Sequence, residues 1–156
     1  MGSKEPVAVT STGGRVNLPG AEVPETATIA IEYPENYLAT FTLGYKAMRY
    51  NQFNDQMKQF HGNKARFDVG RESYALYAES RALDMKADVE SRKPGSFNSA
   101  APQHIRNFMD CIRTRKDPNA SVEAGQATTI TLCMTMDSRR AGRRVKWNAK
   151  TRTVDS

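Results

Sequence analysis

Hydrophobic and polar residues alternate along the first half of the chain. Apolar or aromatic residues occupy every second position of 26–33, and the run 37–43 repeats this alternation after a turn at 34–36. A period of two is that of a β-strand with one face in a core, and two such runs around a short turn predict an antiparallel hairpin. Further strands are expected at 7–11, 57–60, 66–69 and 74–78, with a turn at Gly13-Gly14.

The spacing of apolar residues changes near residue 100. Four of them follow the i, i+3, i+4, i+7 pattern: Ile105, Phe108, Met109 and Ile112. This single apolar stripe predicts an amphipathic helix over about 100–116, with Pro102 tolerated in its first turn. The charged stretch 85–98 before it contains Pro94-Gly95 and is expected to be a surface loop.

A second helix is expected over about 121–141. Ser121 is a suitable N-cap, and Glu123 is well placed in the first turn. The β-branched run 128–131 would also suit a strand. The apolar positions around it cover a wide arc, however, which predicts a helix buried on more than one side.

The order of the elements predicts the fold class. Strands up to about residue 80, two helices and a final strand at 145–148 are typical of an α+β fold. We therefore expect a mainly antiparallel open sheet with helices packed on one face. Residues 1–12 would form an N-terminal segment with the first strand, and residues 13–156 a single domain, because 156 residues give room for one ordinary core.

The outward face of the predicted hairpin is rich in threonine. Thr26, Thr28, Thr40 and Thr42 are polar but uncharged. This character is more typical of a surface that meets another protein than of one facing bulk water. Monomers also carry threonine-rich strand faces, so both interpretations stay open.

The net charge of +6 raises the question of a polyanionic partner. The densest basic cluster consists of Arg139, Arg140, Arg143, Arg144 and Lys146. Because these residues bracket Gly142 at the end of a predicted helix, they would complement the helix dipole around a glycine cap. We expect a structural or solvated role for them and no nucleic acid partner. No apolar run is long enough to span a bilayer and no signal-peptide pattern is present, so we expect no membrane partner and a cytoplasmic location.

The cysteines and histidines predict no metal site. Cys111 and Cys133 lie in apolar stretches and are expected to be buried. His61 and His104 lack Cys or His neighbours at zinc-ligand spacing. We expect His61 in a turn and His104 on a helix surface.

Four segments of the sequence match the pattern of a known family. They are residues 24–34, residues 60–64 at a turn of the Gly-Thr-Lys-Gly kind, residues 104–125 and residues 142–148. Together they resemble the C-terminal domain of the Gfo/Idh/MocA family, nicotinamide-dependent sugar and polyol oxidoreductases of the glucose-fructose oxidoreductase and inositol dehydrogenase type. The similarity runs from about residue 13 to 148 and is most specific between the two predicted helices.

The resemblance implies a cofactor held outside this chain. The family binds NAD or NADP in an N-terminal Rossmann domain, but none of the ten glycines here forms the Gly-x-Gly-x-x-Gly pattern that admits a pyrophosphate. The family's Glu-Lys-Pro and Asp-x-x-x-His motifs are absent too, and Ala65 and Gln126 replace a glycine and a histidine found in relatives. We therefore assign no catalytic, cofactor-binding or metal-binding residue to this chain.

The resemblance also implies contacts with a substrate and with a second copy. The segment after the predicted hairpin would line one side of a substrate pocket. There Lys46, Arg49 and Asn51 would hydrogen-bond hydroxyl groups, and Tyr45 or Tyr50 would stack on a sugar ring. The sheet face of the family mediates self-association, which implies a homodimer or larger oligomer through the threonines named above.

The leading hypothesis is a substrate-side and oligomerisation domain of a Gfo/Idh/MocA-like NAD(P)-dependent oxidoreductase. As a fragment or truncated paralogue it would be catalytically inert alone, and the Rossmann domain would belong to a parent protein. The first alternative is a stand-alone carbohydrate-binding or protein-interaction module. The second is a polyanion-binding protein that uses the basic cluster.

Overall fold

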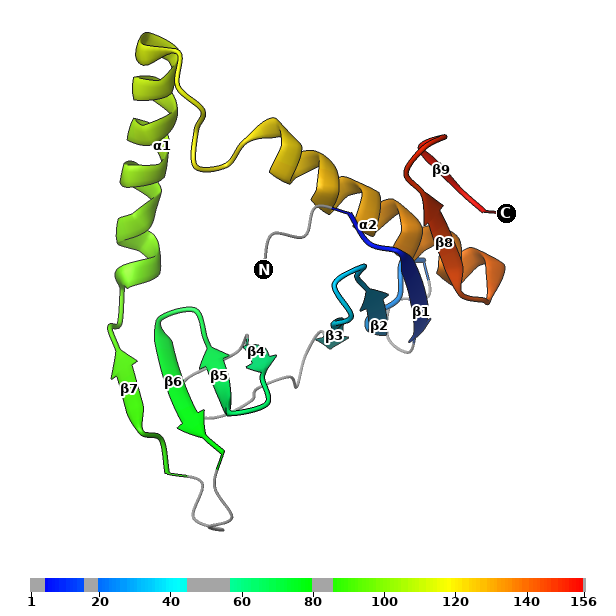
Figure 1. Cartoon of the computed structure of the whole chain (residues 1–156), viewed down its shortest axis with the longest axis horizontal. Coiled ribbons are helices and arrows are strands. Elements are labelled where there is room, and N and C mark those ends of the chain that lie inside the picture. Colours follow the sequence, from blue (N-terminus) through cyan, green and yellow to red (C-terminus); the bar gives the residue numbers. More distant parts are fainter. Residues whose placement is uncertain (1–4, 16–19, 45–56, 80–85, 156) are drawn as a thin grey trace. The chain divides into compact units, whose positions relative to one another are not determined.

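The computed structural model describes residues 5–15, 20–44, 57–79 and 86–155. They belong to two compact units, one made of Met1–Ala47 with Ala120–Ser156 and the other of Met48–Asn119. Each unit contains one open antiparallel sheet (Figure 1), so the α+β class is confirmed. That residues 13–156 act as a single domain stays a prediction.

Sheet A lies in the first unit and takes strands from both ends of the chain. In spatial order they are β3 (Leu38–Gly44), β2 (Thr26–Glu32), β1 (Ala8–Gly14), β8 (Val145–Asn148) and β9 (Thr153–Val154). The predicted hairpin is confirmed as β2 and β3, with Thr28 opposite Thr42. β1 pairs with β2 along its whole length and with β8 through Ala8 and Val9. The predicted final strand is confirmed as β8.

Helix α2 (Val122–Ala141) packs on one face of sheet A, against β1 and β8 (Figure 1). Met134 of α2 is fully buried beside Val9 and Val145, and Ala27 and Ile29 of β2 complete the buried core. Fully burying a side chain of the size of valine or methionine contributes about 1.5–3 kcal/mol. The alternating apolar residues of β1 and β2 therefore form one side of the core, and α2 forms the other.

The β-branched run 128–131 is part of α2, and its threonine hydroxyls are hydrogen-bonded within the helix. The hydroxyls of Thr128, Thr129 and Thr131 each donate to the carbonyl oxygen four residues earlier, at 2.9–3.0 Å. Ser121 is the N-cap, as predicted, and accepts from the N–H of Ala124 at 3.4 Å. Gly142 ends the helix with φ 65°, a left-handed conformation that favours glycine.

Two predictions for the first unit are wrong. Gly13-Gly14 is not a turn, because both residues extend β1, opposite Ala27 and Thr26. A Cβ atom on Gly13 would lie 2.6 Å from the carbonyl oxygen of Thr26, so glycine permits this close approach. Burial of α2 on more than one side is also wrong. Met134 and Ser138 face the sheet, whereas Leu132 is 61% exposed and Cys133 is exposed on the outer side.

Sheet B lies in the second unit. Its strands, in spatial order, are β4 (Lys58–His61), β5 (Ala65–Val69), β6 (Ser73–Ala78) and β7 (Val89–Arg92), each antiparallel to its neighbour. The strands predicted at 57–60, 66–69 and 74–78 are confirmed with small shifts. The loop predicted at 85–98 is wrong, because β7 pairs with β6 as an edge strand.

Helix α1 (Ser96–Thr114) follows β7 after three residues. It begins earlier than the predicted 100–116, so Pro102 lies inside the helix and not in its first turn. Cys111 is half-buried and not buried as expected, because its thiol lies beside the carbonyl oxygen of Asp117, at 3.4 Å, past the end of the helix. The apolar stripe of α1 is exposed, whereas α2 covers a sheet face.

Candidate functional site

The face of sheet A opposite α2 is lined with threonine. Strand alternation brings six exposed residues to it: Thr10 and Thr12 of β1, Thr26 and Thr28 of β2, and Thr40 and Thr42 of β3. We call these six residues the threonine face. In register, Thr12 lies opposite Thr28, and Thr28 opposite Thr42. The structure thus brings the predicted interface candidates together on one surface. Thr10 and Thr12 were not among the predicted interface residues, although residues 10–12 show the same alternation.

The chemistry of the threonine face is uniform and uncharged. Each hydroxyl can donate one hydrogen bond and accept others, and each methyl group is apolar. Gly14 of β1 and Gly44 of β3 are the residues paired with Thr26 on either side, so no side chain projects from the sheet beside Thr26. Such a surface suits a close contact with another flat surface or with ligand hydroxyl groups.

An ion pair borders the threonine face at the end of β2. Arg144 donates from Nε and Nη2 to the two carboxylate oxygens of Glu32, both at 2.6 Å. These charge-assisted hydrogen bonds lower the pKa of Glu32 and raise the pKa of Arg144. Because both side chains are about 40% exposed, the pair is open to screening by salt.

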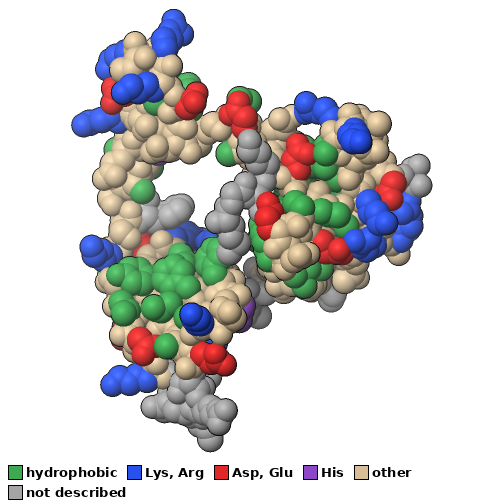
Figure 2. All heavy atoms as spheres, in the orientation of Figure 1, with side chains coloured by type: hydrophobic (Ala, Val, Ile, Leu, Met, Phe, Trp, Pro, Cys, Tyr) green, Lys and Arg blue, Asp and Glu red, His purple; other side chains and the backbone are tan. Residues whose placement is uncertain are grey.

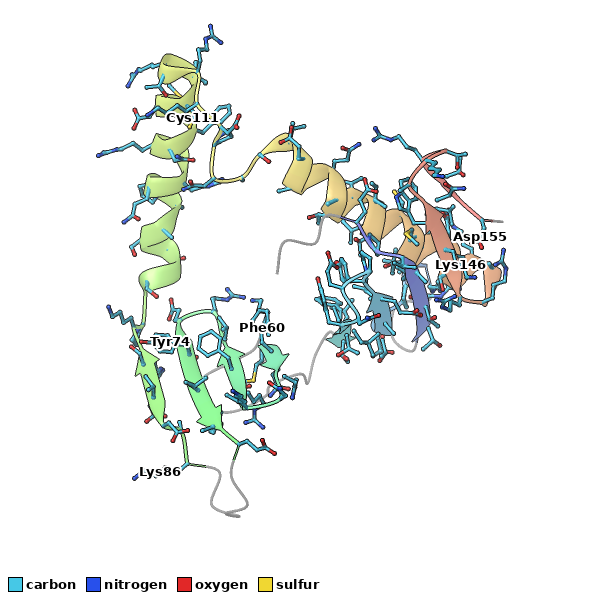
Figure 3. All side chains as sticks on the ribbon, in the orientation of Figure 1. Phe60, Tyr74, Lys86, Cys111, Lys146 and Asp155 are labelled. Atoms are coloured by element: carbon cyan, nitrogen blue, oxygen red, sulfur yellow. The ribbon has the colours of Figure 1, made fainter. Side chains whose placement is uncertain are left out.

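Two side chains of the basic cluster, those of Arg143 and Arg144, are hydrogen-bonded to the protein's own polar groups. Besides the Arg144 pair, Arg143 donates to the carbonyl oxygens of Arg144 and Asp155, at 3.2 and 3.3 Å. The backbone N–H of Lys146 donates to the Asp155 carboxylate, and Figure 3 labels Lys146 on β8 and Asp155 just after β9. These contacts agree with the structural role expected for Arg143 and Arg144.

A second polar cluster, which was not predicted from the sequence, lies on sheet B. Asp68 is 7% exposed and accepts hydrogen bonds from Nε2 of Gln59 at 3.1 Å and from Nε of Arg66 at 3.0 Å. The Arg66 guanidinium lies over the ring of Tyr77, 4.4 Å from its centroid. Stacking and pairing together fix the orientation of this arginine. The only sequence signal was the alternation of Arg66 and Asp68 in one strand.

The two histidines lie apart from these clusters. His61 is exposed at the end of β4, opposite Arg66 and directly before the turn in which it was expected. His104 is exposed on α1, as expected. In the part of the chain that the structure describes, no three His, Cys, Asp or Glu side chains gather in a way that could hold a metal ion. The helices of that same part include none with the length and apolar character needed to cross a membrane.

The predicted substrate contacts lie outside the described residues. They are Tyr45, Lys46, Arg49, Tyr50 and Asn51. Their role in binding a substrate therefore stays a prediction.

Among known proteins, the chain is similar to several solved structures. No protein-family model and no curated protein matches the chain. The aldose-aldose oxidoreductase from Caulobacter crescentus, in a complex with glycerol, is 20% identical with a TM-score of 0.64, over 92% of this chain and 42% of that one. UDP-N-acetylglucosamine 3-dehydrogenase from Acidithiobacillus ferrooxidans is 14% identical with a TM-score of 0.62, over 90% and 42% of the two chains.

A third solved structure is similar over the same part of this chain. An oxidoreductase from Agrobacterium radiobacter, in complex with NAD+, L-tartaric acid and magnesium, is 14% identical with a TM-score of 0.62, over 91% of this chain and 43% of that one. The chain thus spans less than half the length of each of these enzymes. At such identities the comparisons show a common fold, so this chain has the fold of a part of these oxidoreductases.

Proposed function

We propose that the chain is the substrate-side and self-association domain of a nicotinamide-dependent oxidoreductase of the Gfo/Idh/MocA type, at work in the cytoplasm. The observation that carries the proposal is the fold match, in which 92% of this chain aligns with 42% of the aldose-aldose oxidoreductase. The resemblance of residues 104–125 to the C-terminal domain of that family supports the same conclusion.

In this proposal the chain does not transfer hydride by itself. Hydride transfer needs the reacting atoms within about 3–3.5 Å of each other, and the nicotinamide must therefore be held in place. The sequence has no glycine pattern for a dinucleotide. NAD or NADP would be bound by the Rossmann domain of the whole enzyme, while this chain would contribute to substrate binding and assembly.

The proposed substrate class is a sugar or polyol. Two of the similar structures are a sugar oxidoreductase in complex with glycerol and a sugar-nucleotide dehydrogenase. The predicted contacts from Tyr45 to Asn51 combine aromatic rings with hydrogen-bonding groups, the combination that recognises a sugar ring.

Nicotinamide binding tests the proposal directly. We expect calorimetric titration of the chain with NADH and NADPH to show no saturable binding at micromolar concentrations. Saturable micromolar binding would overturn the inert-domain proposal. Injection of the same NADH and NADPH solutions into buffer without protein controls for heats of dilution.

The proposed self-association uses the threonine face. A two-fold axis through a flat face pairs the same patch with itself, and Thr28 and Thr42 lie opposite each other near its middle. An obligate interface of this kind buries on the order of 2,000 Å² or more. Replacing both residues with lysine would place like charges near the axis and should dissociate the oligomer.

Light scattering coupled to size exclusion at micromolar concentration measures this association. We expect an even-numbered oligomer for the unaltered chain and a smaller species for Thr28→Lys with Thr42→Lys. Thr129→Lys, on the exposed side of α2, is the matched control and should leave the oligomer unchanged. A monodisperse species near 17.4 kDa for the unaltered chain would contradict self-association.

The alternative of a polyanion-binding protein is testable with the same samples. The contacts of Arg143 and Arg144 with Glu32 and backbone carbonyls favour a structural role for the basic cluster. We expect weak binding to DNA or heparin that is lost at moderate salt. Tight binding that persists near 200 mM salt and disappears on Arg143→Ala with Arg144→Ala would favour the polyanion alternative.

A further inference from the structure

Sheet B carries an open apolar face. Phe60, Phe67, Leu76 and Val89 lie opposite one another in register across the four strands. The ring centroid of Tyr74 lies 6.0 Å from that of Phe67, so Tyr74 belongs to the same group. We call these five residues the aromatic face. Figure 2 shows a hydrophobic patch over sheet B, and Figure 3 labels Phe60 and Tyr74 there.

The side chains of the aromatic face are unusually exposed for their size. Phe60 is 46%, Tyr74 44% and Val89 51% exposed. Soluble proteins rarely leave a contiguous patch of large apolar side chains open, and such patches commonly mark binding sites. The aromatic face therefore needs a partner.

Helix α1, in the same unit, carries a second open apolar surface. Its four stripe residues are Ile105 (62% exposed), Phe108 (55%), Met109 (46%) and Ile112 (48%). We call these the α1 stripe. An apolar helix stripe laid on an apolar sheet face is one of the stable layer arrangements of proteins. The chain thus contains both halves of a helix-on-sheet contact, and each half is open.

A hydrogen-bonded connection holds the start of α1 to sheet B while both surfaces stay open. The N–H of Gly95 donates to the carboxylate of Glu72 at 2.8 Å, and the N–H of Lys93 donates to the backbone carbonyl of Glu72 at 2.9 Å. α1 has no side-chain N-cap of its own and no acidic residue in its first turn. The Glu72 carboxylate therefore also stabilises the positive end of this helix.

We infer that two copies of the chain exchange their α1 helices, so that the α1 stripe of each copy covers the aromatic face of the other. In the structure the α1 stripe is open and does not pack on its own sheet, and a second copy supplies the complementary surface. Such a reciprocal exchange closes with two-fold symmetry and leaves neither apolar surface open. The inference concerns the second unit and does not depend on the proposed enzymatic role.

The areas favour the exchange over a simpler contact. A large aromatic side chain buries about 150–250 Å², so a half-exposed one offers about 100 Å². One stripe on one aromatic face would then remove about 800 Å² from water, and the two contacts of an exchange about 1,600 Å². That total is the size of a stable protein interface, whereas a single helix-to-helix or sheet-to-sheet contact would provide about half of it.

A charge-pair experiment tests the exchange. One variant carries Phe108→Lys in the α1 stripe, and the other carries Phe67→Glu in the aromatic face. All chains also carry Thr28→Lys and Thr42→Lys, which separates this contact from association through the threonine face. Gln103→Lys, two positions before Ile105 and so on the other side of α1, is the control. Circular dichroism checks folding, and Phe60→Glu replaces Phe67→Glu if that variant does not fold.

Light scattering after size exclusion gives the readout. We expect a dimer for the background chain and for Gln103→Lys. Phe108→Lys and Phe67→Glu, each measured alone, should be monomers, with a dimer dissociation constant at least tenfold higher than that of the background chain. Mixing the two variants should restore a dimer, because one contact is then unaltered and the other pairs lysine with glutamate. A monomeric background chain, a dimer that survives Phe108→Lys, or a mixture that stays monomeric would each overturn the exchange.

Discussion

The backbone N–H of Ser11 donates to the hydroxyl oxygen of Ser138 at 2.9 Å, and the same hydroxyl donates to the carbonyl oxygen of Arg143 at 2.6 Å. Ser138 is fully buried and Ser11 is 8% exposed. β8 begins at Val145, opposite Val9, so the N–H of Ser11 lies beyond the strand that would otherwise receive it. The Ser138 side chain therefore provides an acceptor for a free backbone N–H of β1 and connects α2 to sheet A.

Ser138→Ala should destabilise the first unit. The substitution leaves the buried N–H of Ser11 without its acceptor, and such an unsatisfied group costs about 1–3 kcal/mol. Urea denaturation followed by circular dichroism measures the free energy of unfolding. Thr129→Ala, which removes an exposed hydroxyl from the same helix, is the control and should cost less than about 0.5 kcal/mol. Equal effects of the two substitutions would contradict the role of Ser138.

Gly13→Ala should be much more harmful than Gly14→Ala. A Cβ atom at Gly13 would lie 2.6 Å from the carbonyl oxygen of Thr26 and 2.9 Å from two side-chain carbons of Pro24. At Gly14 the nearest atom is Oγ1 of Thr26 at 3.6 Å, which is an ordinary contact. We expect Gly13→Ala to lower the free energy of unfolding by about 1–3 kcal/mol. Thermal denaturation of the two variants side by side makes the comparison.

Met134→Ala should open a cavity in the core of sheet A. Met134 is fully buried against β1 and β8, and truncating such a side chain costs about 2–5 kcal/mol. Leu132→Ala, two positions away and 61% exposed, is the matched control. The free energies of unfolding of the two variants, measured by chemical denaturation, should differ by at least about 1.5 kcal/mol. A Leu132 variant as unstable as the Met134 variant would show that α2 packs by another face.

Arg144→Gln should change the dependence of stability on pH. The hydrogen bonds from Arg144 lower the folded-state pKa of Glu32 below its ordinary value of 4.5. The stabilisation is therefore complete above the unfolded-state pKa and is lost as the pH falls through the folded-state pKa.

Melting temperatures measured against pH check this prediction. The variant should melt below the unaltered chain at pH 7, and the difference should shrink at acidic pH and in high salt. Arg113→Gln, which removes the more exposed ion pair with Asp110, is the control and should show a smaller change. A difference that persists unchanged at acidic pH would rule out the Glu32 pairing as its cause.

Elements with a strong local pattern could be predicted from the sequence. β2 and β3 alternate clearly, and their pairing brings Thr28 opposite Thr42 as the hairpin requires. β7 was missed because Val89 is the only apolar residue among its four, and an edge strand is held by backbone pairing to β6. The helical state of 128–131 follows from the packing of Ile130 and Met134 of α2 on the core of sheet A, which outweighs the weak helix propensity of β-branched residues.

The candidate site could be predicted only in part. The threonine face follows from alternation, because residues two apart share a face whatever the sheet packs against. The cluster around Asp68 could not be found, since Gln59 and Tyr77 come from other strands and meet it through register alone. The exposure of the α1 stripe could not be predicted either. The helical spacing of its apolar residues shows that one face of the helix is apolar, but it does not show which surface covers that face.

The construction of sheet A from both ends of the chain has a consequence during synthesis. β1 and β2 are made before sheet B, whereas α2 and β8, which cover Val9, are made after it. A growing chain can complete sheet B from neighbouring strands while the inner faces of β1 and β2 still face water. At roughly 5–20 residues per second this interval lasts on the order of ten seconds. Until α2 and β8 have been made, Val9, Ala27 and Ile29 are therefore open to chaperones that bind exposed apolar strands.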